Sequence, residues 1–262
     1  MPPRPPAVVL AWAARERSRL FVRNALPRRR FRVTVVRDAD EFAVAARSAL
    51  VDLALVDTGV PDEMWPLAEL AREFPSIGFV ALSPGRAADA QAIERCLGLD
   101  FAEVLIEGID DVAVEPMLEP LGFGARFAAA LADPPDALGL TTPLQRDAWR
   151  HIVAHGGLPV RTELLAALLG VTREHLSRTF SAAGAPNLKR IMDLVRLIAA
   201  AELSKNPGFD VGDVARVLRF ASSSHLSTTA QRIVGTRPAS LARLRTVDLI
   251  ERFVHGRSRS RS

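Results

Sequence analysis

The residues best suited to chemistry lie in two segments of the chain, about 50 positions apart. In each segment, polar side chains recur at positions i, i+3, i+4 and i+7, a spacing that gathers them on one face of a helix. They are Glu174, Ser177, Arg178 and Ser181 in the first segment and Ser224, Ser227, Thr228 and Gln231 in the second. Hydroxyl, amide and guanidinium groups on such a face can hydrogen-bond to base edges in the DNA major groove. The spacing therefore predicts two helices that contact nucleic acid.

Apolar residues on the opposite side of each segment indicate how these helices are held. The inward stripes are Leu176, Phe180 and Ala183 in the first helix and Leu226, Ala230 and Ile233 in the second. Each helix follows a shorter helix and a tight turn. The first short helix is expected to pack through Leu164, Leu165 and Leu168, with Gly170 in its turn. In the second turn Arg219 precedes Phe220, and a positive φ there would cost a residue other than glycine about 1 kcal/mol.

Further helices are expected around these two helix-turn-helix units. Thr142 and Gln145 form a capping box with Pro143 at the first helical position, and this helix ends near residue 156. Thr162 is expected to cap a helix over 163–169, and Asp210 to cap the first short helix of the second unit. A long helix over 187–204 joins the two units. From position 141 the pattern is therefore entirely helical.

Residues spaced through 162–245 form a pattern that links both units. They are Leu168-Leu169-Gly170-Val171-Thr172, Leu176-Ser177-Arg178, Phe180, Arg196-Leu197, Ala200, Leu203, Val214-Ala215, Phe220, Gly235 and Pro238. With this pattern, 162–245 resembles the DNA-binding domain of AraC-type transcription regulators. The resemblance implies that two recognition helices enter successive major grooves, about 34 Å apart on one face of the DNA. The chain departs from the family at Arg219, Leu226, Thr228 and Ala230, so we expect the first unit to dominate specificity.

The resemblance also implies which residues touch DNA. Base contacts fall to Glu174, Ser177 and Arg178 in the first unit and to Ser223, Ser224, His225, Ser227 and Thr228 in the second, with Arg173 beside the first set. Basic side chains placed to contact phosphates are Lys189, Arg190, Arg196, Arg232, Arg237, Arg243 and Arg245. The alternative for both polar faces is an ordinary solvated surface.

The first part of the chain, through about position 110, alternates short apolar runs with amphipathic helices. The expected strands cover 8–12, 31–36, 53–56, 77–82 and 104–106, and the expected helices cover 13–26, 41–50, 65–74 and 87–97. Apolar strands separated by helices predict a parallel sheet covered on both faces. Five such units suit an α/β flavodoxin-like domain with a five-stranded parallel sheet.

Asp57 follows the third apolar run, in the segment Val56-Asp57-Thr58-Gly59-Val60-Pro61. With Ser83 after the next run, this segment resembles the receiver domains of response regulators, and Asp57 aligns with their phosphoacceptor. Phosphoryl transfer to a carboxylate needs a Mg²⁺ ion held by oxygen ligands. The positions of the family's acidic pair, 12–15, hold no carboxylate here, and Glu107 stands where the family has lysine. We therefore expect a pseudo-receiver.

Three roles stay open for Asp57: an exposed carboxylate at a strand end, a true phosphoacceptor, or part of some other ligand-gated site. Other candidate residues have simpler explanations. Cys96 is expected to be a core thiol, His151 and His155 are surface residues that lack a third metal ligand, and residues 28–30 form a solvated basic loop rather than a phosphate-binding one. We expect no metal and no cofactor.

Composition excludes several classes of protein. The single cysteine rules out a disulfide scaffold and fits a reducing cytoplasm, and no apolar run is long enough to span a membrane. The formal charge of +4 hides a division: residues 1–50 carry a net +7, residues 51–150 a net −12 and residues 151–262 a net +9. A basic C-terminal half indicates a polyanionic partner.

The sequence thus predicts a cytoplasmic transcription regulator that is not an enzyme and that binds double-stranded DNA. The expected domains are a receiver-like domain at 1–122, a linker at 123–140, an AraC-type DNA-binding domain at 141–250 and a basic tail at 251–262. A homodimer through the N-terminal domain or linker, and contact with RNA polymerase, are further expectations. The rival interpretations are a phosphorylation-driven response regulator that uses Asp57, and a ligand- or partner-sensing adaptor with weakened DNA binding.

Overall fold

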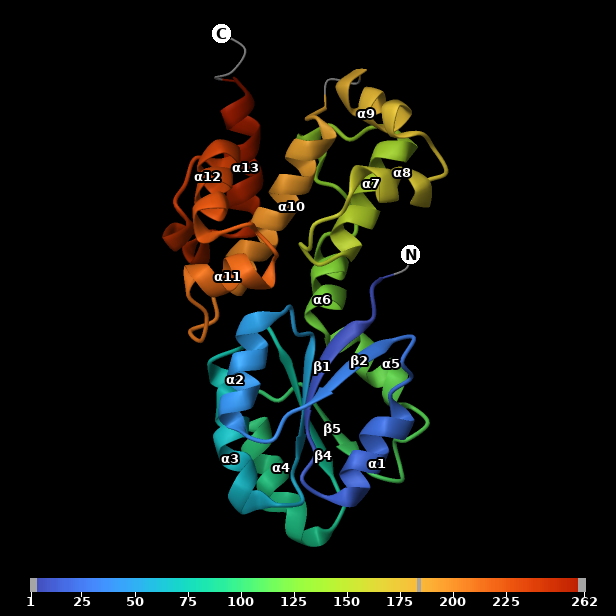
Figure 1. Cartoon of the computed structure of the whole chain (residues 1–262), viewed down its shortest axis with the longest axis vertical. Helices are drawn as coiled ribbons and strands as arrows, with labels where there is room; N and C mark the ends of the chain where they lie inside the picture. The colour runs from blue at the N-terminus through green and yellow to red at the C-terminus, as the bar shows by residue number, and fades with distance from the viewer. Residues whose placement is uncertain (1–3, 183–184, 259–262) are drawn as a thin grey trace. The chain divides into compact units, whose positions relative to one another are not determined.

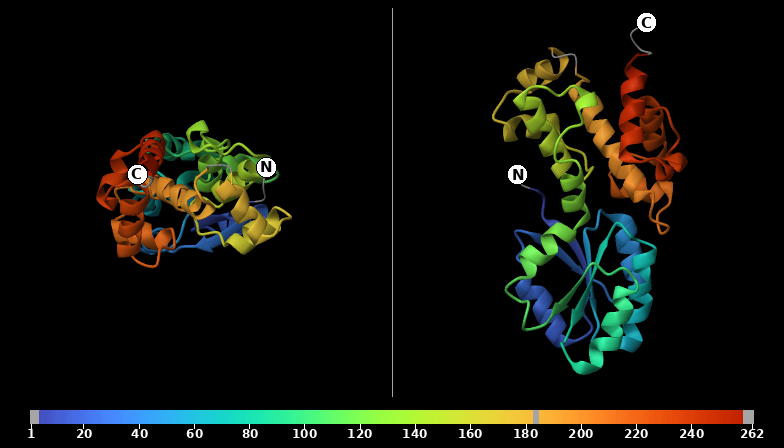
Figure 2. Two further views of the ribbon diagram at one scale, coloured as in Figure 1. Left: turned by 90° about the horizontal axis from the view of Figure 1, so that it is seen from above. Right: turned by 180° about the vertical axis from the view of Figure 1, so that it is seen from behind.

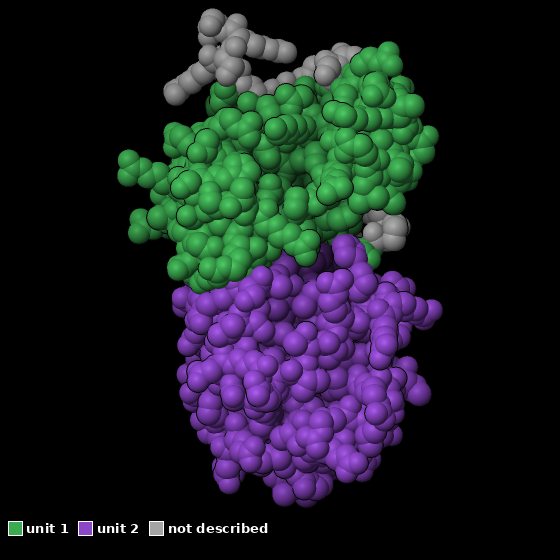
Figure 3. Space-filling view, viewed as in Figure 1, with its two compact units in different colours: residues 1–4, 127–205, 210–262 green, residues 5–126, 206–209 purple. Residues whose placement is uncertain are grey.

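The computed structural model describes residues 4–182 and 185–258. The chain forms two compact units, one of residues 5–126 with 206–209 and the other of residues 1–4, 127–205 and 210–262 (Figure 3). Each unit has a fold of its own, and each is described separately below.

The first unit is built on a five-stranded parallel sheet with the strand order β2-β1-β3-β4-β5. The strands are β1 (Ala7–Trp12), β2 (Phe31–Val35), β3 (Leu53–Asp57), β4 (Gly78–Ser83) and β5 (Glu103–Ile106). In the register, Val9 of β1 pairs with Val33 of β2 and with Leu53 of β3. The order reverses direction at β1, which is the flavodoxin-like topology. The fold class predicted for this part of the chain is confirmed.

Helices cover both faces of the sheet, and the apolar residues of the strands form two separate cores (Figures 1 and 2). The helices are α1 (Glu16–Ala25), α2 (Ala39–Ser48), α3 (Pro61–Glu69), α4 (Ala90–Leu97) and α5 (Val114–Leu118), with short 3-10 turns η1 (Leu70–Arg72), η2 (Ala87–Asp89) and η3 (Glu119–Leu121). Phe42, Met64 and Cys96 fill the core under α2, α3 and α4. Phe21 and Leu118 fill the core under α1 and α5. Because both faces are buried, the central strands are apolar throughout.

The second unit is helical. Its elements are α7 (Pro143–Ala154), α8 (Thr162–Leu168), α9 (Arg173–Ala182), α10 (Leu188–Leu203), α11 (Val211–Val217), α12 (Ser223–Val234) and α13 (Thr246–Ser258), with 3-10 turns η4 (Asp136–Leu138) and η5 (Pro238–Arg243). Helix α10 runs between the group α7–α9 and the group α11–α13 (Figure 1). The all-α part with two helix-turn-helix units is therefore confirmed as well.

The segment expected as a linker, 123–140, begins with a helix, as its sequence between two proline-containing stretches allowed. Helix α6 (Phe123–Ala130) spans the division between the units, and Leu131 and Leu138 of the expected linker are buried. The indole Nε1 of Trp149 donates a hydrogen bond of 2.8 Å to the carbonyl of Leu131. Leu131 and Leu138 therefore pack within the helical unit, while the linker assignment for 123–140 stays a prediction.

The first residues of the expected basic tail, 251–262, are part of a helix. Helix α13 continues to Ser258, and Phe253 is fully buried because its ring lies against the core of the helical unit. Residues 259–262 lie outside the described part of the chain, as do Ala183 and the side chain of Ser181.

Two local expectations in α8 are wrong. Thr162 does not cap this helix, because the helix begins at Thr162 itself with Arg161 at the cap position and no side-chain hydrogen bond there. Leu165 is buried, whereas Leu164 and Leu168 are 50% and 42% exposed. A helix of seven residues presents a narrow inner face, and here Leu165 and Ala166 occupy it.

Candidate nucleic-acid interface and the Asp57 cluster

The first helix-turn-helix unit consists of α8, a turn and α9. The turn ends α8 with Gly170 at φ +67°, and the amide of Val171 donates to the carbonyl of Ala166 at 3.0 Å. The hydroxyl of Thr172 then accepts from the amide of His175 and caps α9. Helix α9 packs inward through Leu176 and Phe180, which are both fully buried. Its opposite face is thereby turned to solvent.

The second unit repeats this geometry in α11, a turn and α12. Asp210 and Asp213 form a capping box that begins α11. Arg219 occupies the left-handed position at φ +53°, and the amide of Phe220 donates to the carbonyl of Ala215 at 2.8 Å. Ser222 caps α12 by accepting from the amide of His225. The positive φ that the sequence analysis associated with Arg219 is present, so this turn is the same as the first but lacks its glycine.

Arg196 holds the turn of the second unit. Its guanidinium lies 3.8 Å from the centroid of the Phe220 ring, and its Nη2 donates to the carbonyls of Leu218 at 3.1 Å and Arg219 at 3.3 Å. Burial lowers the pKa of Arg196. The ring of His225 meets Phe220 edge-on at 5.7 Å. Nη2 of Arg196 thus bonds to the last carbonyls of this turn, and the phosphate contact expected for Arg196 stays a prediction.

The remaining side chains predicted to touch DNA are placed as follows. Most of them are exposed: Arg173, Glu174, Ser177, Arg178, Ser223, Ser224, His225, Ser227, Thr228 and Lys189. Arg173 forms an ion pair with Glu163 at 3.2 Å, and Arg232 forms one with Asp193 of α10 at 2.7 Å. Arg190 is half-buried with its guanidinium 5.1 Å from the centroid of the Phe253 ring. The turns thus bring the predicted residues of each unit together on one face, while their contacts with DNA stay predictions.

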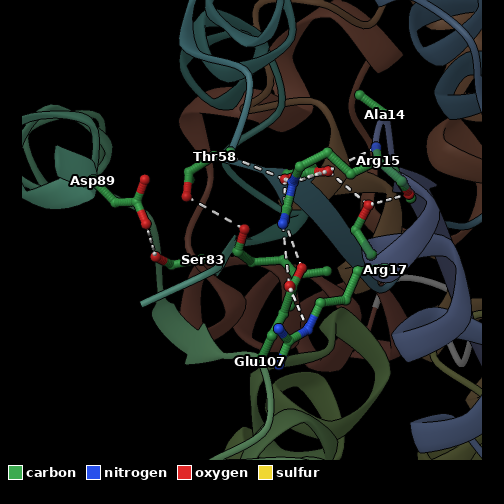
Figure 4. A network of polar contacts seen from close by, with 12 residues as sticks. Ala14, Arg15, Arg17, Thr58, Ser83, Asp89 and Glu107 are labelled. Atoms are coloured by element: carbon green, nitrogen blue, oxygen red, sulfur yellow. Dashed lines mark hydrogen bonds and ion pairs between the residues drawn. The ribbon is translucent and has the colours of Figure 1, made fainter. Parts of the chain in front are cut away.

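The second cluster of functional interest surrounds Asp57 at the carboxyl end of β3. Figure 4 shows Arg15, Arg17 and Glu107 of this cluster. The side chain of Arg15, in the loop after β1, lies between two buried carboxylates, those of Asp57 and Glu107. Its Nε donates to Asp57 at 2.8 Å, its Nη1 donates to Glu107 at 3.1 Å, and its Nη2 lies 2.5 Å from an oxygen of each. Burial lowers the pKa of Arg15, but the hydrogen bonds to Glu107 and Asp57 outweigh burial and raise it.

Both oxygens of the Asp57 carboxylate accept hydrogen bonds from groups in addition to the Arg15 guanidinium. Its Oδ1 also accepts from the amide of Gly59 at 2.9 Å, and its Oδ2 accepts from the hydroxyl of Ser18 at 2.6 Å and the amide of Arg15 at 3.2 Å. The side chain of Asp57 is 0% exposed. The prediction of an exposed carboxylate at a strand end is therefore wrong, because the loop after β1 folds over Asp57.

Two features of the sequence bear on this cluster: positions 12–15 lack acidic residues, and Glu107 stands where the receiver family has lysine. The pairing of Arg15 with Glu107 was not predicted from them. The two exchanges are complementary: Arg15 lies where the receiver family has carboxylates, and Glu107 lies where that family has a lysine. That reciprocal change of charge is the signal by which the cluster could have been found.

Ser83 belongs to a neighbouring group of polar residues. Its hydroxyl accepts from the amide of Gly85 at 3.0 Å and lies 3.4 Å from Asp89. Burial raises the pKa of Asp89, but the hydrogen bonds from Arg86 outweigh burial and leave that pKa below its usual value. Ser83 and Asp89 are both buried, so this group stabilises the loop after β4.

The other candidate residues have structural roles. Cys96 is fully buried, and burial raises the pKa of its thiol from 9.0 to about 11. Arg29 and Arg30 form ion pairs with Glu115, at 3.8 Å and 2.9 Å. Among the described residues, no three His, Cys, Asp or Glu side chains are grouped in a way that could hold a metal ion. Within the same part of the chain, no helix has the length and apolar character needed to cross a membrane.

Comparison with known proteins identifies the helical part. Residues 165–243 match a family model described as a helix-turn-helix domain, and this domain is of the AraC type. No curated protein is significantly similar to the chain. The resemblance predicted for both helix-turn-helix units is thus confirmed.

Similar solved structures include response regulators. Full-length FixJ from B. japonicum is 14% identical, with 72% of this chain and 95% of that chain covered and a TM-score of 0.40. RcsB from Salmonella enterica serovar Typhimurium, bound to the promoter rprA, is 16% identical, with 71% and 97% covered and a TM-score of 0.35. A response regulator from Thermotoga maritima is 19% identical, with 43% and 98% covered and a TM-score of 0.36.

Proposed function

We propose that this protein is a sequence-specific transcription regulator that binds double-stranded DNA through both helix-turn-helix units. The observation that carries the proposal is the repeated turn geometry, which leaves one polar face of α9 and one of α12 exposed. Such faces fit the major groove, and two of them on one domain would enter successive grooves. In this proposal the protein acts by binding DNA and not by catalysis. It acts in the cytoplasm.

The basic character of the helical part supplies the attraction for DNA. Lys189 and Arg237 are exposed and stand near the ends of α10 and α12, where they would contact phosphates. Arg232 would do so only by sharing its guanidinium between the DNA and Asp193. Arg178 is the exposed arginine in the middle of α9, and its fork of donors suits the O6 and N7 atoms of guanine.

Binding to duplex DNA across a salt series tests this proposal. If about six basic side chains contact phosphates, the slope of log affinity against log salt concentration is about −5. Arg178→Ala should cost about 1–3 kcal/mol on a site selected from random DNA. Arg252→Ala, an exposed arginine of α13, is the matched control and should leave binding unchanged. A slope near zero would instead favour an adaptor with weakened DNA binding, and an unchanged footprint for Arg178→Ala would remove Arg178 from the contacts.

For the α/β unit we propose a regulatory or dimerisation domain that works without phosphorylation. Support comes from Arg15, whose guanidinium occupies the space beside Asp57 in which a metal ion and a phosphoryl group would have to lie. Phosphorylation would require Arg15 to leave both Asp57 and Glu107, each of them buried. A homodimer formed through this unit, and contact with RNA polymerase, belong to the same proposal, and sedimentation of the full chain measures the first of them.

Calorimetry with a phosphate analogue distinguishes this proposal from a phosphorylation-driven response regulator. Beryllofluoride with Mg²⁺ should give no binding heat with the full chain. The matched variant Asp57→Asn should give the same trace. Tight binding that disappears in Asp57→Asn would establish Asp57 as a phosphoacceptor and overturn the proposal.

A further inference from the structure

The polar face of α12 differs in its chemistry from that of α9. At the positions spaced 0, 3, 4 and 7 along the exposed face, α12 carries Ser224, Ser227, Thr228 and Gln231. The first three are hydroxyls on short side chains, which can bond to several bases and discriminate weakly among them. Gln231 is the long side chain of this set, and its amide offers both donors and an acceptor. The capacity for strong discrimination on this face therefore lies at Gln231.

The correspondence between the two units indicates why the long polar side chain of α12 lies further along the helix than that of α9. The caps Thr172 and Ser222 and the buried residues Leu176 and Leu226 align the two helices at an offset of 50 positions. By this offset, Arg178 of α9 corresponds to Thr228 of α12. The long polar side chain of the first unit is thus replaced by a short one. Gln231 lies about one helical turn after Thr228 and again provides a long polar side chain on this face.

The surroundings of Gln231 leave its amide available. Gln231 is exposed, and its side chain makes no hydrogen bond to the described part of the chain. The next residue, Arg232, is by contrast tied to Asp193 at 2.7 Å. Gln231 lines a groove together with Ser224, Ser227 and Thr228 on its own helix and with Arg237 and Pro238 from the segment that follows α12. Arg237 is also exposed, which places a cation on the other side of the groove.

We propose that Gln231 determines the specificity of the second unit by recognising an A·T base pair. Its amide would accept from adenine N6 and donate to adenine N7, the paired contact that glutamine makes in the major groove. The recognition helix of homeodomains contacts bases from positions with the same 0, 3, 4, 7 spacing, so a side chain at the last position of such a face can reach a base. Arg237 would contact a phosphate beside that base pair and fix the register of α12.

The proposal rests on the proposed DNA binding, and its test separates the two. A preferred site is first selected with the full-length chain from a random duplex library, and affinities are then measured for every single base-pair change in it. Gln231→Ala should lose about 5- to 100-fold of discrimination at one A·T pair and keep the preferences elsewhere. Gln231→Glu should shift the preference at that pair towards C·G, because a carboxylate accepts from cytosine N4.

Arg237→Ala is the matched control on the opposite side of the groove. It should weaken all sites by a similar factor and reduce the salt slope by about 1, without changing base preference. If no site is selected and the salt slope is near zero, the proposed function itself fails. If a site is selected but both Gln231 variants keep every base preference of the native chain, DNA binding stands and the role of Gln231 is overturned.

Discussion

At the scale of single residues, the cluster of Arg15, Asp57 and Glu107 decides what the α/β unit can do. One guanidinium pairs with two carboxylates that are 0% and 1% exposed, and Arg17 lies 3.5 Å from the second of them, Glu107. A buried charge is tolerated only when it is paired and hydrogen-bonded. The cluster therefore supplies from within the chain the positive charge that a bound cation would otherwise have to provide.

Removing Arg15 should destabilise the protein strongly. In Arg15→Ala, Asp57 would be left buried without its counter-charge and Glu107 would keep only the exposed Arg17, and we expect a loss of about 3 kcal/mol in the free energy of unfolding measured in urea. Arg17→Ala is the matched control: Arg17 is 70% exposed and lies 3.5 Å from Glu107, so its loss should stay below about 1 kcal/mol. Equal losses in the two variants would show that Arg15 is not the central cation.

At the scale of elements, the turn between α8 and α9 and the turn between α11 and α12 share a backbone geometry but differ in sequence, so they can be compared directly. Gly170 adopts φ +67° at no steric cost, whereas Arg219 adopts φ +53° with a side chain. The strain at Arg219 is offset by Arg196, which donates to the carbonyls of Leu218 and Arg219 and packs on Phe220. The second unit thus uses a side chain where the first uses glycine.

Exchanging the residue types at these turns should shift stability in opposite directions. Gly170→Ala should cost about 1 kcal/mol through its φ alone, since a Cβ at Gly170 would meet no atom within 4 Å. Arg219→Gly should raise the free energy of unfolding by up to about 1 kcal/mol by relieving the same strain. Urea unfolding measures both changes. A destabilised Arg219→Gly would mean that the arginine side chain contributes more than its backbone costs.

At the scale of the whole molecule, the net charge of +4 is the sum of three opposed parts, of which residues 1–50 contribute +7. Residues 151–262 carry +9, which fits a DNA-binding domain, and residues 51–150 carry −12, most of it in the α/β unit. Net attraction to a polyanion therefore arises mainly in the helical unit. The overall charge would have understated that attraction.

Local patterns in the sequence were sufficient to predict most elements and both helix-turn-helix units. The capping boxes at Thr142 and Asp210 and the apolar strand at 53–57 depend on residues close together in the chain, so their effect can be recognised without a fold. The family resemblance added the order of the grooves and the candidate contacts. Predictions failed locally where a short helix such as α8 left its inner face undefined.

Only the tertiary structure decided which partners the charged residues have. Arg15 meets Asp57 and Glu107, which lie 42 and 92 positions away, because the parallel strands bring their carboxyl ends to one edge of the sheet. Arg196 meets a turn 22 positions further on because α10 packs beside α11. The sequence by itself determined where helices, strands and the two polar faces lie, since periodicity and capping act over a few residues. Which arginine is free to contact DNA and which is bound within the protein depends on packing between distant segments.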